Sequence, residues 1–363
     1  MELELGFGKK TITVDLPDKN VLGILQPTLP PQEESPEAML QDALHNPIGT
    51  PRLSNIVQFG ETVAIVTSDI TRPMPSAIVL PALLQELELG GIKKTDIVIV
   101  FALGSHRKHT EEEQRYLVGD EVYESVRCID SNQEDCVEVG ETPTNHTPLK
   151  VFRPVAEADR IICMGNIEYH YFAGYSGGGK ALMPGVCTRE AIQANHSLMV
   201  LDAAKAGDMD SNPVRIDIEE ATEIIGCDFI LNVVLDEHKK IRKIVCGHAV
   251  QAHRAGAAYL DTIYQIPISV RGDIVLVSPG GYPKDINLYQ AQKALDNAKH
   301  AVRKGGIIVW VASCKEGYGE HVFERWIKEA TESGDLIKRV NQHFELGGHK
   351  AAAISMVLQN ARV

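Results

Sequence analysis

Short runs of apolar, often β-branched residues recur along the chain, and each is followed by a polar tip. The runs 62–67 and 97–103 carry almost no polar residue, which is typical of strands buried on both faces of a parallel sheet. Helices are predicted after their tips, over 75–89 and through the acidic stretch that begins at Glu111. This repeated order of strand, polar tip and helix predicts an α/β fold with a mainly parallel sheet.

The remaining pattern places further elements on both sides of a predicted domain boundary. In chain order they are strands over 11–14 and 21–25, a helix over 35–45, strands over 161–164, 229–235 and 241–246, a helix over 249–264, and strands over 273–277 and 306–311. Because the strand at 273–277 opens a fresh unit, we predict two α/β domains, over 1–267 and, smaller, over 268–350. Residues 351–363 are predicted to form a helix that packs back toward the first domain. The active site is expected in the cleft between the two domains.

Composition narrows the class of protein. Of 363 residues, 44% are hydrophobic and 23% charged, which is ordinary for a soluble globular protein. The formal net charge of −13, with no dense basic cluster, argues against a nucleic-acid partner. No apolar run approaches the length of a membrane span, and the N-terminus lacks the basic and apolar regions of a signal peptide. The 7 cysteines form no C-x-x-C pair, which predicts reduced, mostly buried thiols and a cytoplasmic protein.

A glycine-rich stretch from Gly174 to Lys180 is the most unusual local feature. Its Gly174-x-x-x-x-Gly179-Lys180 spacing matches a phosphate-binding P-loop. The match is incomplete, because Ala181 replaces the hydroxyl residue that binds magnesium and Pro184 falls in the first turns of the helix that a P-loop must open. A nucleotide-dependent transferase using this loop is therefore disfavoured, and a flexible loop with a solvated lysine stays as the plain alternative.

Polar side chains gather at the predicted strand ends, where Asp69, Arg72, His106 and His170 each follow an apolar run. In open α/β sheets ligands bind beyond the carboxyl ends of the strands, so these separated residues are expected at one rim. Histidine at such a tip is suited to general acid or base catalysis. The structural alternatives are an Asp69–Arg72 ion pair at a helix start and a neutral, packed His170 between two tyrosines.

Two further candidates lie on predicted helices. His196 is either a packing residue or a metal ligand. Gln290 and Lys293 lie one turn apart on one helix face, which is either an ordinary solvated face or one directed at a ligand. None of these residues decides the function alone.

Five separated motifs are more specific together than any one of them. They are Asp69-x-Thr71-Arg72-Pro73, Gly104-Ser105-His106-Arg107, His170-x-x-x-Gly174-x-Ser176-Gly177-Gly178-x-Lys180, Ala194-Asn195-His196 and Tyr289-Gln290-x-x-Lys293. In order and spacing they resemble the nickel-pincer lactate racemase family along nearly the whole chain, from about Val63 to Lys293. One departure is Gly179, where the family frequently has arginine; it bears on substrate choice and on contacts to the cofactor phosphate more than on cofactor attachment.

The resemblance implies a role for each matching residue. Lys180 is expected to carry the nickel-pincer nucleotide, a pyridinium mononucleotide, through a thioamide bond, and His196 to ligate its nickel. His106 and His170 are expected to exchange the substrate hydroxyl proton from opposite faces. Further cofactor contacts are expected from Asp69, Thr71, Arg72, Ser176, Gly177 and Gly178. Substrate contacts are expected from Arg72, Tyr289, Gln290 and Lys293.

The activity implied by the resemblance is racemisation or epimerisation of a lactate-like 2-hydroxy acid, by reversible hydride transfer to the lysine-tethered cofactor. Such an isomerase binds a small-molecule substrate, depends on cofactor-biosynthesis enzymes and is compatible with a homo-oligomer. Two alternatives stay open. A zinc hydrolase could use His106, His170 and His196, although no H-E-x-x-H motif occurs. A non-catalytic small-molecule binder could keep the same fold.

Overall fold

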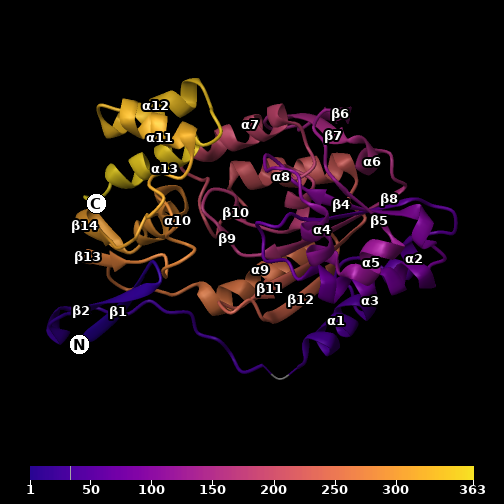
Figure 1. The fold of residues 1–363 in the computed structure, drawn as a ribbon, viewed down its shortest axis with the longest axis horizontal. Coiled ribbons are helices and arrows are strands. Elements are labelled where there is room, and N and C mark those ends of the chain that lie inside the picture. Colours follow the sequence, from indigo (N-terminus) through magenta and orange to yellow (C-terminus); the bar gives the residue numbers. More distant parts are fainter. Residues whose placement is uncertain (33) are drawn as a thin grey trace. The chain divides into compact units, whose positions relative to one another are not determined.

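The computed structural model describes residues 1–32 and 34–363, which divide into two compact units (Figure 1). The larger unit is Pro27–Gln265, and the smaller unit combines Met1–Gln26 with Ile266–Val363. The predicted α/β class with a mainly parallel central sheet is confirmed. The extent predicted for the N-terminal domain, 1–267, differs from the larger unit, because Met1–Gln26 groups with the C-terminal part of the chain.

Six strands form the central sheet of the larger unit, in the spatial order β12–β11–β8–β3–β4–β5. They are β3 (Val63–Ser68), β4 (Ile97–Ala102), β5 (Arg127–Asp130), β8 (Arg160–Ile167), β11 (Phe229–Leu235) and β12 (Ile241–Gly247). All neighbours are parallel except β11 and β12. The register aligns Ile65 of β3 with Ile99 of β4 and Ile162 of β8. The loops that follow these three strands therefore leave the sheet at one edge.

Helices α1 (Pro36–His45) and α3 (Ser76–Leu89) pack on one face of this sheet. Their buried side chains, including Leu44 and Leu83, join alternate strand residues such as Ile65 in one hydrophobic cluster. The strands of a parallel sheet are covered on both faces and therefore carry near-continuous apolar runs. Such runs predict this sheet correctly.

Helices begin where short polar side chains cap them. The hydroxyl of Ser35 accepts from the amide at the third residue of α1, and Thr110 forms a capping box with Glu113 in α4 (Glu111–Val118). Asn212 caps α8 (Pro213–Ile225), whose first residue is a proline with no amide to satisfy. These three caps fix where α1, α4 and α8 begin.

The opposite face of the sheet carries α9 (Gln251–Tyr264) and the short turn η3 (Gly178–Ala181), which packs on β3 and β8. Gly256 allows the close approach of α9, because a Cβ added there would lie 2.4 Å from the side chain of Ile167. The other elements of this unit are α2 (Leu53–Ile56), η2 (Lys94–Asp96), α5 (Asp120–Ser125), β6 (Cys136–Glu141), β7 (Pro148–Phe152), α6 (Arg153–Ala156), β9 (Tyr169–His170), β10 (Gly174–Tyr175), α7 (Arg189–Ser197) and η4 (Leu198–Val200).

The smaller unit contains an N-terminal hairpin, a parallel strand pair and four helices. Its elements are β1 (Glu2–Phe7), β2 (Lys10–Asp15), η1 (Asp18–Asn20), β13 (Gly272–Val277), α10 (Leu288–Ala298), β14 (Val302–Trp310), α11 (His321–Glu329), α12 (Ser333–Gln342) and α13 (Gly348–Leu358). The amide of Gly8 donates to Asp285 at 2.6 Å and the hydroxyl of Ser278 donates to the carbonyl of Gly6 at 2.5 Å, so the hairpin is bonded to this unit.

One prediction about the N-terminal part of the chain is wrong. Residues 21–25 form no strand, because β1 pairs only with β2 and no further strand is available to them. The C-terminal helix α13 packs on α10, α11 and α12 of its own unit, where its small residues Ala351 and Ala352 are buried, and its packing toward the first domain stays a prediction.

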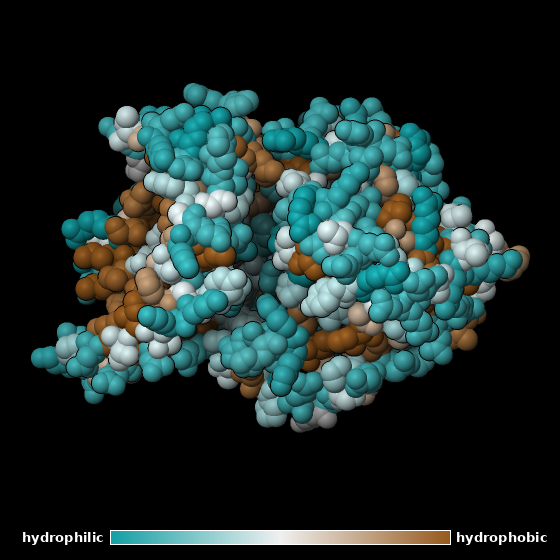
Figure 2. All heavy atoms as spheres, in the orientation of Figure 1, coloured by the Kyte–Doolittle hydropathy of each residue, from teal (hydrophilic) through white to brown (hydrophobic). Residues whose placement is uncertain are grey.

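The strand pair of the smaller unit carries exposed hydrophobic residues. Hydrophobic residues gather over β13 and β14 (Figure 2), where Ile274 and Val309 are exposed. None of the helices in the described ranges combines the length and the apolar content needed to cross a lipid bilayer.

The seven cysteines are all free, and three of them, Cys163, Cys187 and Cys246, are buried. The prediction that most thiols are buried is therefore only partly right.

Candidate active site

The loops after β3 and β4 bring Asp69, Thr71 and His106 together. The ring Nδ1 of His106 donates to Asp69 Oδ2 at 2.7 Å, and the Thr71 hydroxyl donates to Asp69 Oδ1 at 2.9 Å. Burial opposes ionisation of Asp69, but the hydrogen bonds and charge of His106, the bond from Thr71 and the charge of Arg72 outweigh it, so the pKa of Asp69 lies below its usual value. Asp69 is thus a carboxylate that selects the Nδ1–H tautomer of His106 and leaves Nε2 as the basic nitrogen.

Arg72 does not form the helix-capping ion pair with Asp69 that was weighed as an alternative. Its guanidinium donates to the Thr71 hydroxyl at 3.4 Å, and its backbone amide donates to the Asp69 carbonyl at 3.0 Å. The carboxylate of Asp69 is bonded instead to His106 and Thr71. Arg72 therefore lies at this loop as a half-buried cation beside the histidine.

His170 lies in the short hairpin formed by β9 and β10. Its Nδ1 accepts from the amide of Ala173 at 3.2 Å, and its ring stacks on Tyr171 and meets Phe172 edge-on at 4.5 Å. Burial lowers the pKa of His170 well below its usual value, and the positive charges of Lys180, Arg72, His196 and Arg215 lower it further.

The bonding of His170 assigns its protons. A neutral ring that accepts at Nδ1 carries its proton on Nε2, which is the opposite tautomer to His106. His106 thus presents a basic Nε2, whereas His170 presents an Nε2–H that donates a hydrogen bond. The alternative of a packed, neutral His170 is half right, since the ring is packed and neutral yet surrounded by the cations of the candidate site.

The glycines before Lys180 allow its backbone to pack closely against α8 and α9. A Cβ at Gly178 would lie 2.9 Å from the His253 ring of α9, and a Cβ at Gly179 would lie 1.7 Å from the Thr222 hydroxyl of α8. The position where the family frequently has arginine therefore has no room for any side chain in this chain. Gly178 also has a φ of 58°, a conformation that favours glycine.

Polar contacts hold the same turn in place. The amide of Gly178 donates to Asn232 Oδ1 at 2.7 Å, and His253 Nε2 donates to the Ser176 carbonyl at 2.8 Å. The Ser176 hydroxyl donates to the Asn166 carbonyl at 2.8 Å and accepts from a backbone amide. Ser176 was predicted to bind cofactor; its hydroxyl is engaged in joining the two ends of the loop.

The turn is not a P-loop. Residues 178–181 form a single 3-10 turn, and the next α-helix, α7, begins only at Arg189. A P-loop presents the amides at the start of a helix that follows its lysine directly, and that helix is missing here. The nucleotide-dependent transferase is therefore not supported.

Lys180 lies in an electropositive, poorly solvated place. Burial and the charges of Arg215 and Arg72 lower the pKa of Lys180 to about 7, against a smaller opposing effect of Glu168. Arg215 is fully buried and donates to the carbonyls of Ala173 and Tyr175. A large fraction of Lys180 is therefore a neutral, nucleophilic amine near neutral pH.

His196 is buried in α7, and a polar chain sets its tautomer. Asn195 Nδ2 donates to Asp217 Oδ2 at 2.8 Å, which directs the Asn195 oxygen to His196 Nδ1 at 3.1 Å. The ring thus carries its proton on Nδ1 and has Nε2 as the unprotonated nitrogen, which is the form that ligates a metal. Its ring meets Phe172 edge-on at 4.9 Å.

The three histidines do not build a protein-only metal site. Within the described residues no group of three or more histidine, cysteine, aspartate or glutamate side chains is arranged to hold a metal ion. A structural or catalytic zinc site draws at least three ligands from the protein. A zinc hydrolase built on His106, His170 and His196 is therefore not supported.

The predicted substrate residues Tyr289, Gln290 and Lys293 lie on α10 of the smaller unit. Tyr289 packs edge-on against Phe323 at 5.5 Å and below the ammonium of Lys350, and burial, with the charge of a nearby glutamate, raises its pKa to about 12. Gln290 and Lys293 are exposed on one face of the helix, as their spacing predicts.

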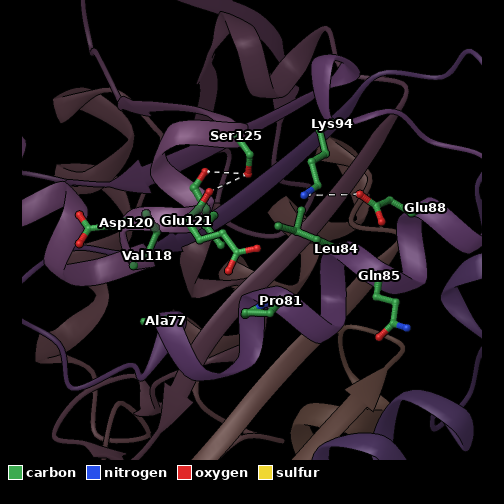
Figure 3. Close-up of a pocket in the computed structure, with 12 residues that line it drawn as sticks. Ala77, Pro81, Leu84, Gln85, Glu88, Lys94, Val118, Asp120, Glu121 and Ser125 are labelled. Atoms are coloured by element: carbon green, nitrogen blue, oxygen red, sulfur yellow. Dashed lines mark hydrogen bonds and ion pairs between the residues drawn. The ribbon is translucent and has the colours of Figure 1, made fainter.

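Sequence reasoning missed two residues at this rim, His109 and Asp130. They form a buried hydrogen-bonded pair between the loop after β4 and the end of β5. The signal available was a second histidine three residues after His106. A surface cavity of about 240 Å³ (Figure 3) lies elsewhere, between α3, α4 and α5, and none of the predicted site residues lines it.

Comparison with known proteins now identifies the family. Residues 7–207 match the lactate racemase N-terminal domain and residues 268–346 the lactate racemase C-terminal domain. The lactate racemase of Thermoanaerobacterium thermosaccharolyticum is 35% identical over 344 residues, which cover 93% of this chain and 80% of that protein. This chain belongs to the lactate racemase family.

A second lactate racemase, from Lactiplantibacillus plantarum, is 34% identical over 328 residues, covering 88% of this chain and 77% of that protein. The structure of the lactate racemase apoprotein from T. thermosaccharolyticum superimposes with a TM-score of 0.91 at 32% identity, over 99% of this chain and 87% of that one. A Thermotoga maritima protein, 22% identical with a TM-score of 0.64, shares the fold. The lactate racemase fold therefore extends over both units of the chain.

Proposed function

We propose that this chain is a lactate racemase, an isomerase that interconverts the enantiomers of lactate or a closely similar 2-hydroxy acid. Membership of the lactate racemase family supports the reaction class. The observation that carries the mechanism is the opposite protonation of His106 and His170, one presenting a basic Nε2 and the other an Nε2–H.

Racemisation requires that a proton leave the substrate hydroxyl and return from the other side. His106, oriented by the Asp69 carboxylate, takes the hydroxyl proton when one enantiomer is bound. The product hydroxyl takes its proton from the opposite face, from His170 in its doubly protonated form, because a neutral ring that lost its Nε2 proton would be left as an imidazolate. One turnover therefore leaves a proton on His106 and removes one from His170, and proton exchange with solvent or a turnover in the reverse direction restores both rings.

The residues of the larger unit fit the nickel-pincer nucleotide implied by the family. Lys180, with a pKa of about 7, would supply the nucleophilic amine for a thioamide bond, and the unprotonated Nε2 of His196 would ligate nickel. Arg72 and Arg215 supply positive charge beside Lys180, which suits an anionic group. The backbone of Gly177 and Gly178, with Asp69 and Thr71, completes the proposed cofactor contacts. When bound, the cofactor supplies the acceptor and donor of the hydride on substrate carbon 2.

Substrate recognition follows from charge. The guanidinium of Arg72 and the ring of His106 both lie within hydrogen-bond distance of the Thr71 hydroxyl. A guanidinium at this place suits the planar carboxylate of a 2-hydroxy acid. The assignment of Tyr289, Gln290 and Lys293 to substrate binding remains a prediction that the family resemblance supports. Dependence on cofactor-biosynthesis enzymes likewise follows from the proposed cofactor.

The test is production of the protein together with the cofactor-making enzymes. We expect an added mass on Lys180 and, because one cofactor site is proposed, about one nickel per chain. We also expect interconversion of D- and L-lactate, measured by chiral chromatography. Lys180→Ala is expected to lose the adduct and the activity, whereas Lys243→Ala, at an exposed lysine of β12, keeps both.

Isotope retention tests the hydride step. With lactate deuterated at carbon 2, partial turnover is expected to leave the label on carbon 2 of both enantiomers. Extensive exchange of the label with solvent would indicate a carbanion mechanism and overturn the hydride proposal. Protein that carries no adduct and binds a 2-hydroxy acid without converting it would instead support the non-catalytic binder.

A further inference from the structure

His109, in the loop after β4, and Asp130, at the end of β5, form a second imidazole–carboxylate pair. The ring Nδ1 of His109 donates to Asp130 Oδ1 at 2.6 Å, and the His109 backbone amide donates to Oδ2 at 2.8 Å. The two side chains are only 1% and 9% exposed, and the His109 ring packs edge-on against Phe101 at 5.2 Å. A pair so enclosed does not meet a substrate, so any contribution to the reaction passes through other residues.

The second ring nitrogen of His109 reaches the loop that carries Asp69. The backbone amide of Ile70 donates to His109 Nε2 at 3.0 Å. A ring that donates from Nδ1 and accepts at Nε2 is the neutral Nδ1–H tautomer, and the Asp130 carboxylate selects that tautomer. Asp130 therefore determines whether His109 can hold the amide of Ile70.

Ile70 lies in the chain between Asp69, which bonds to His106, and Thr71. Asp69 and Thr71, its chain neighbours, hydrogen-bond to each other, and Asp69 orients His106. A peptide that is fixed at Ile70 fixes the direction of both neighbouring side chains, because each lies one residue from the anchored amide. The hydrogen bond from Ile70 to His109 thus affects His106 through the backbone of Asp69 and Ile70.

We propose that Asp130 and His109 are positioning residues for His106: they fix the peptide at Ile70, and through it the Asp69 carboxylate that selects the His106 tautomer. The proposal rests on the proposed function, in which His106 exchanges the substrate proton. A misplacement of about 1 Å in a reacting group costs roughly 10²-fold in rate, so a loosened loop lowers kcat. KM depends on substrate contacts that this pair does not make and changes less.

Three substitutions separate the positioning effect from packing. Asp130→Asn keeps the side-chain volume but replaces one carboxylate oxygen with an NH₂ group. The side chain can then no longer accept from both the ring and the backbone amide of His109. His109→Phe keeps the ring against Phe101 and removes both nitrogens. His109→Gln keeps a side-chain oxygen that can accept from Ile70. The matched control is Glu141→Gln in the exposed Glu141–His146 pair, where the imidazole and carboxylate lie 3.0 Å apart at the surface.

The first measurement uses the apoprotein, so it does not depend on cofactor or activity. Amide hydrogen exchange at Ile70, compared with Val66 in β3, and the ¹⁵N shifts of the His106 ring report loop anchoring and tautomer. We expect Asp130→Asn and His109→Phe to speed exchange at Ile70 at least tenfold, with Val66 unchanged, and to mix the His106 tautomers. His109→Gln should recover part of both, and Glu141→Gln should change neither.

The second measurement uses the cofactor-loaded enzyme, well below the melting temperature of each variant. We expect kcat to fall about 10- to 100-fold in Asp130→Asn and His109→Phe, less in His109→Gln, with KM within about threefold. Unchanged Ile70 exchange and His106 tautomer in both strong variants would overturn the proposal, as would equal acceleration at Ile70 and Val66. If wild-type enzyme carries the adduct but shows no racemisation, the proposed function fails, and the apoprotein measurement still decides whether this pair anchors the loop.

Discussion

His106 donates its Nδ1 proton to Asp69 at 2.7 Å, and the two residues differ sharply in exposure: the Asp69 side chain is buried, whereas that of His106 is 42% exposed. A buried carboxylate that orients an accessible imidazole is the arrangement of a general base whose second nitrogen faces the ligand. The carboxylate is kept ionised against the cost of its burial by the hydrogen bonds and charges around it. In the proposed mechanism, proton transfer therefore depends on Asp69 as well as on the two histidines.

Replacing Asp69 with asparagine tests that dependence. The amide NH₂ cannot accept the Nδ1 proton, so the ring shifts toward the tautomer that lacks a basic Nε2. We expect kcat to fall roughly 10²- to 10⁴-fold in the loaded enzyme, measured by chiral assay of lactate. Asp120→Asn, at an exposed position of α5, is the control and should leave kcat unchanged. Full activity of the adduct-bearing Asp69→Asn protein would remove the general-base assignment of His106.

Replacing Gly179 with alanine tests the close packing under Lys180. The added Cβ would lie 1.7 Å from the Thr222 hydroxyl, so the turn or α8 must move. We expect the free energy of unfolding to fall by roughly 1–3 kcal/mol, measured by urea denaturation of the apoprotein. Gly23→Ala, where nothing lies within 4 Å, should have little effect. The double variant with Thr222→Gly should recover part of the loss, and a Gly179→Ala protein as stable as wild type would contradict the packing.

Replacing Lys180 with methionine tests its lowered pKa. The pKa falls from 10.5 to about 7 on folding, so between these values the unfolded chain binds a proton that the native state does not. Native stability therefore rises with pH through this window, and the cost of burying Lys180 is fully present below pH 7 (the folded pKa). We expect Lys180→Met to stabilise the apoprotein more at a pH below this window than within it, measured by urea unfolding. The exposed Lys243→Met variant should show no such pH dependence, and an equal gain at both pH values would contradict the shift.

Replacing His196 with alanine separates cofactor attachment from metal binding. Attachment is assigned to Lys180 and nickel ligation to His196, so the variant should keep the adduct mass and lose nickel and activity. Intact mass spectrometry and metal analysis on one preparation give both readouts. His238→Ala, at an exposed histidine, should retain nickel. Wild-type nickel content in His196→Ala would mean that another residue ligates the metal.

The local pattern of residues was sufficient for the fold class and for most elements of the central sheet. Buried parallel strands require near-continuous apolar runs, and β3, β4 and β11 lie at the predicted runs for that reason. Spacing along the chain also predicted that Asp69 and His106 lie at one edge, because the carboxyl ends of parallel strands meet there. The motif order indicated the lactate racemase family before any contact was known.

The tertiary structure alone decided which side chains bond to one another and where the chain ends pack. Asp69 bonds to His106 rather than to Arg72, and Lys180 acquires its lowered pKa from burial and from Arg215, contacts that residue order does not contain. Met1–Gln26 joins the C-terminal unit because the hairpin bonds there, far along the sequence. Sequence by itself determined the elements and their chemistry, since these depend on neighbouring residues; distances, tautomers and pKa shifts depend on residues that only folding brings together.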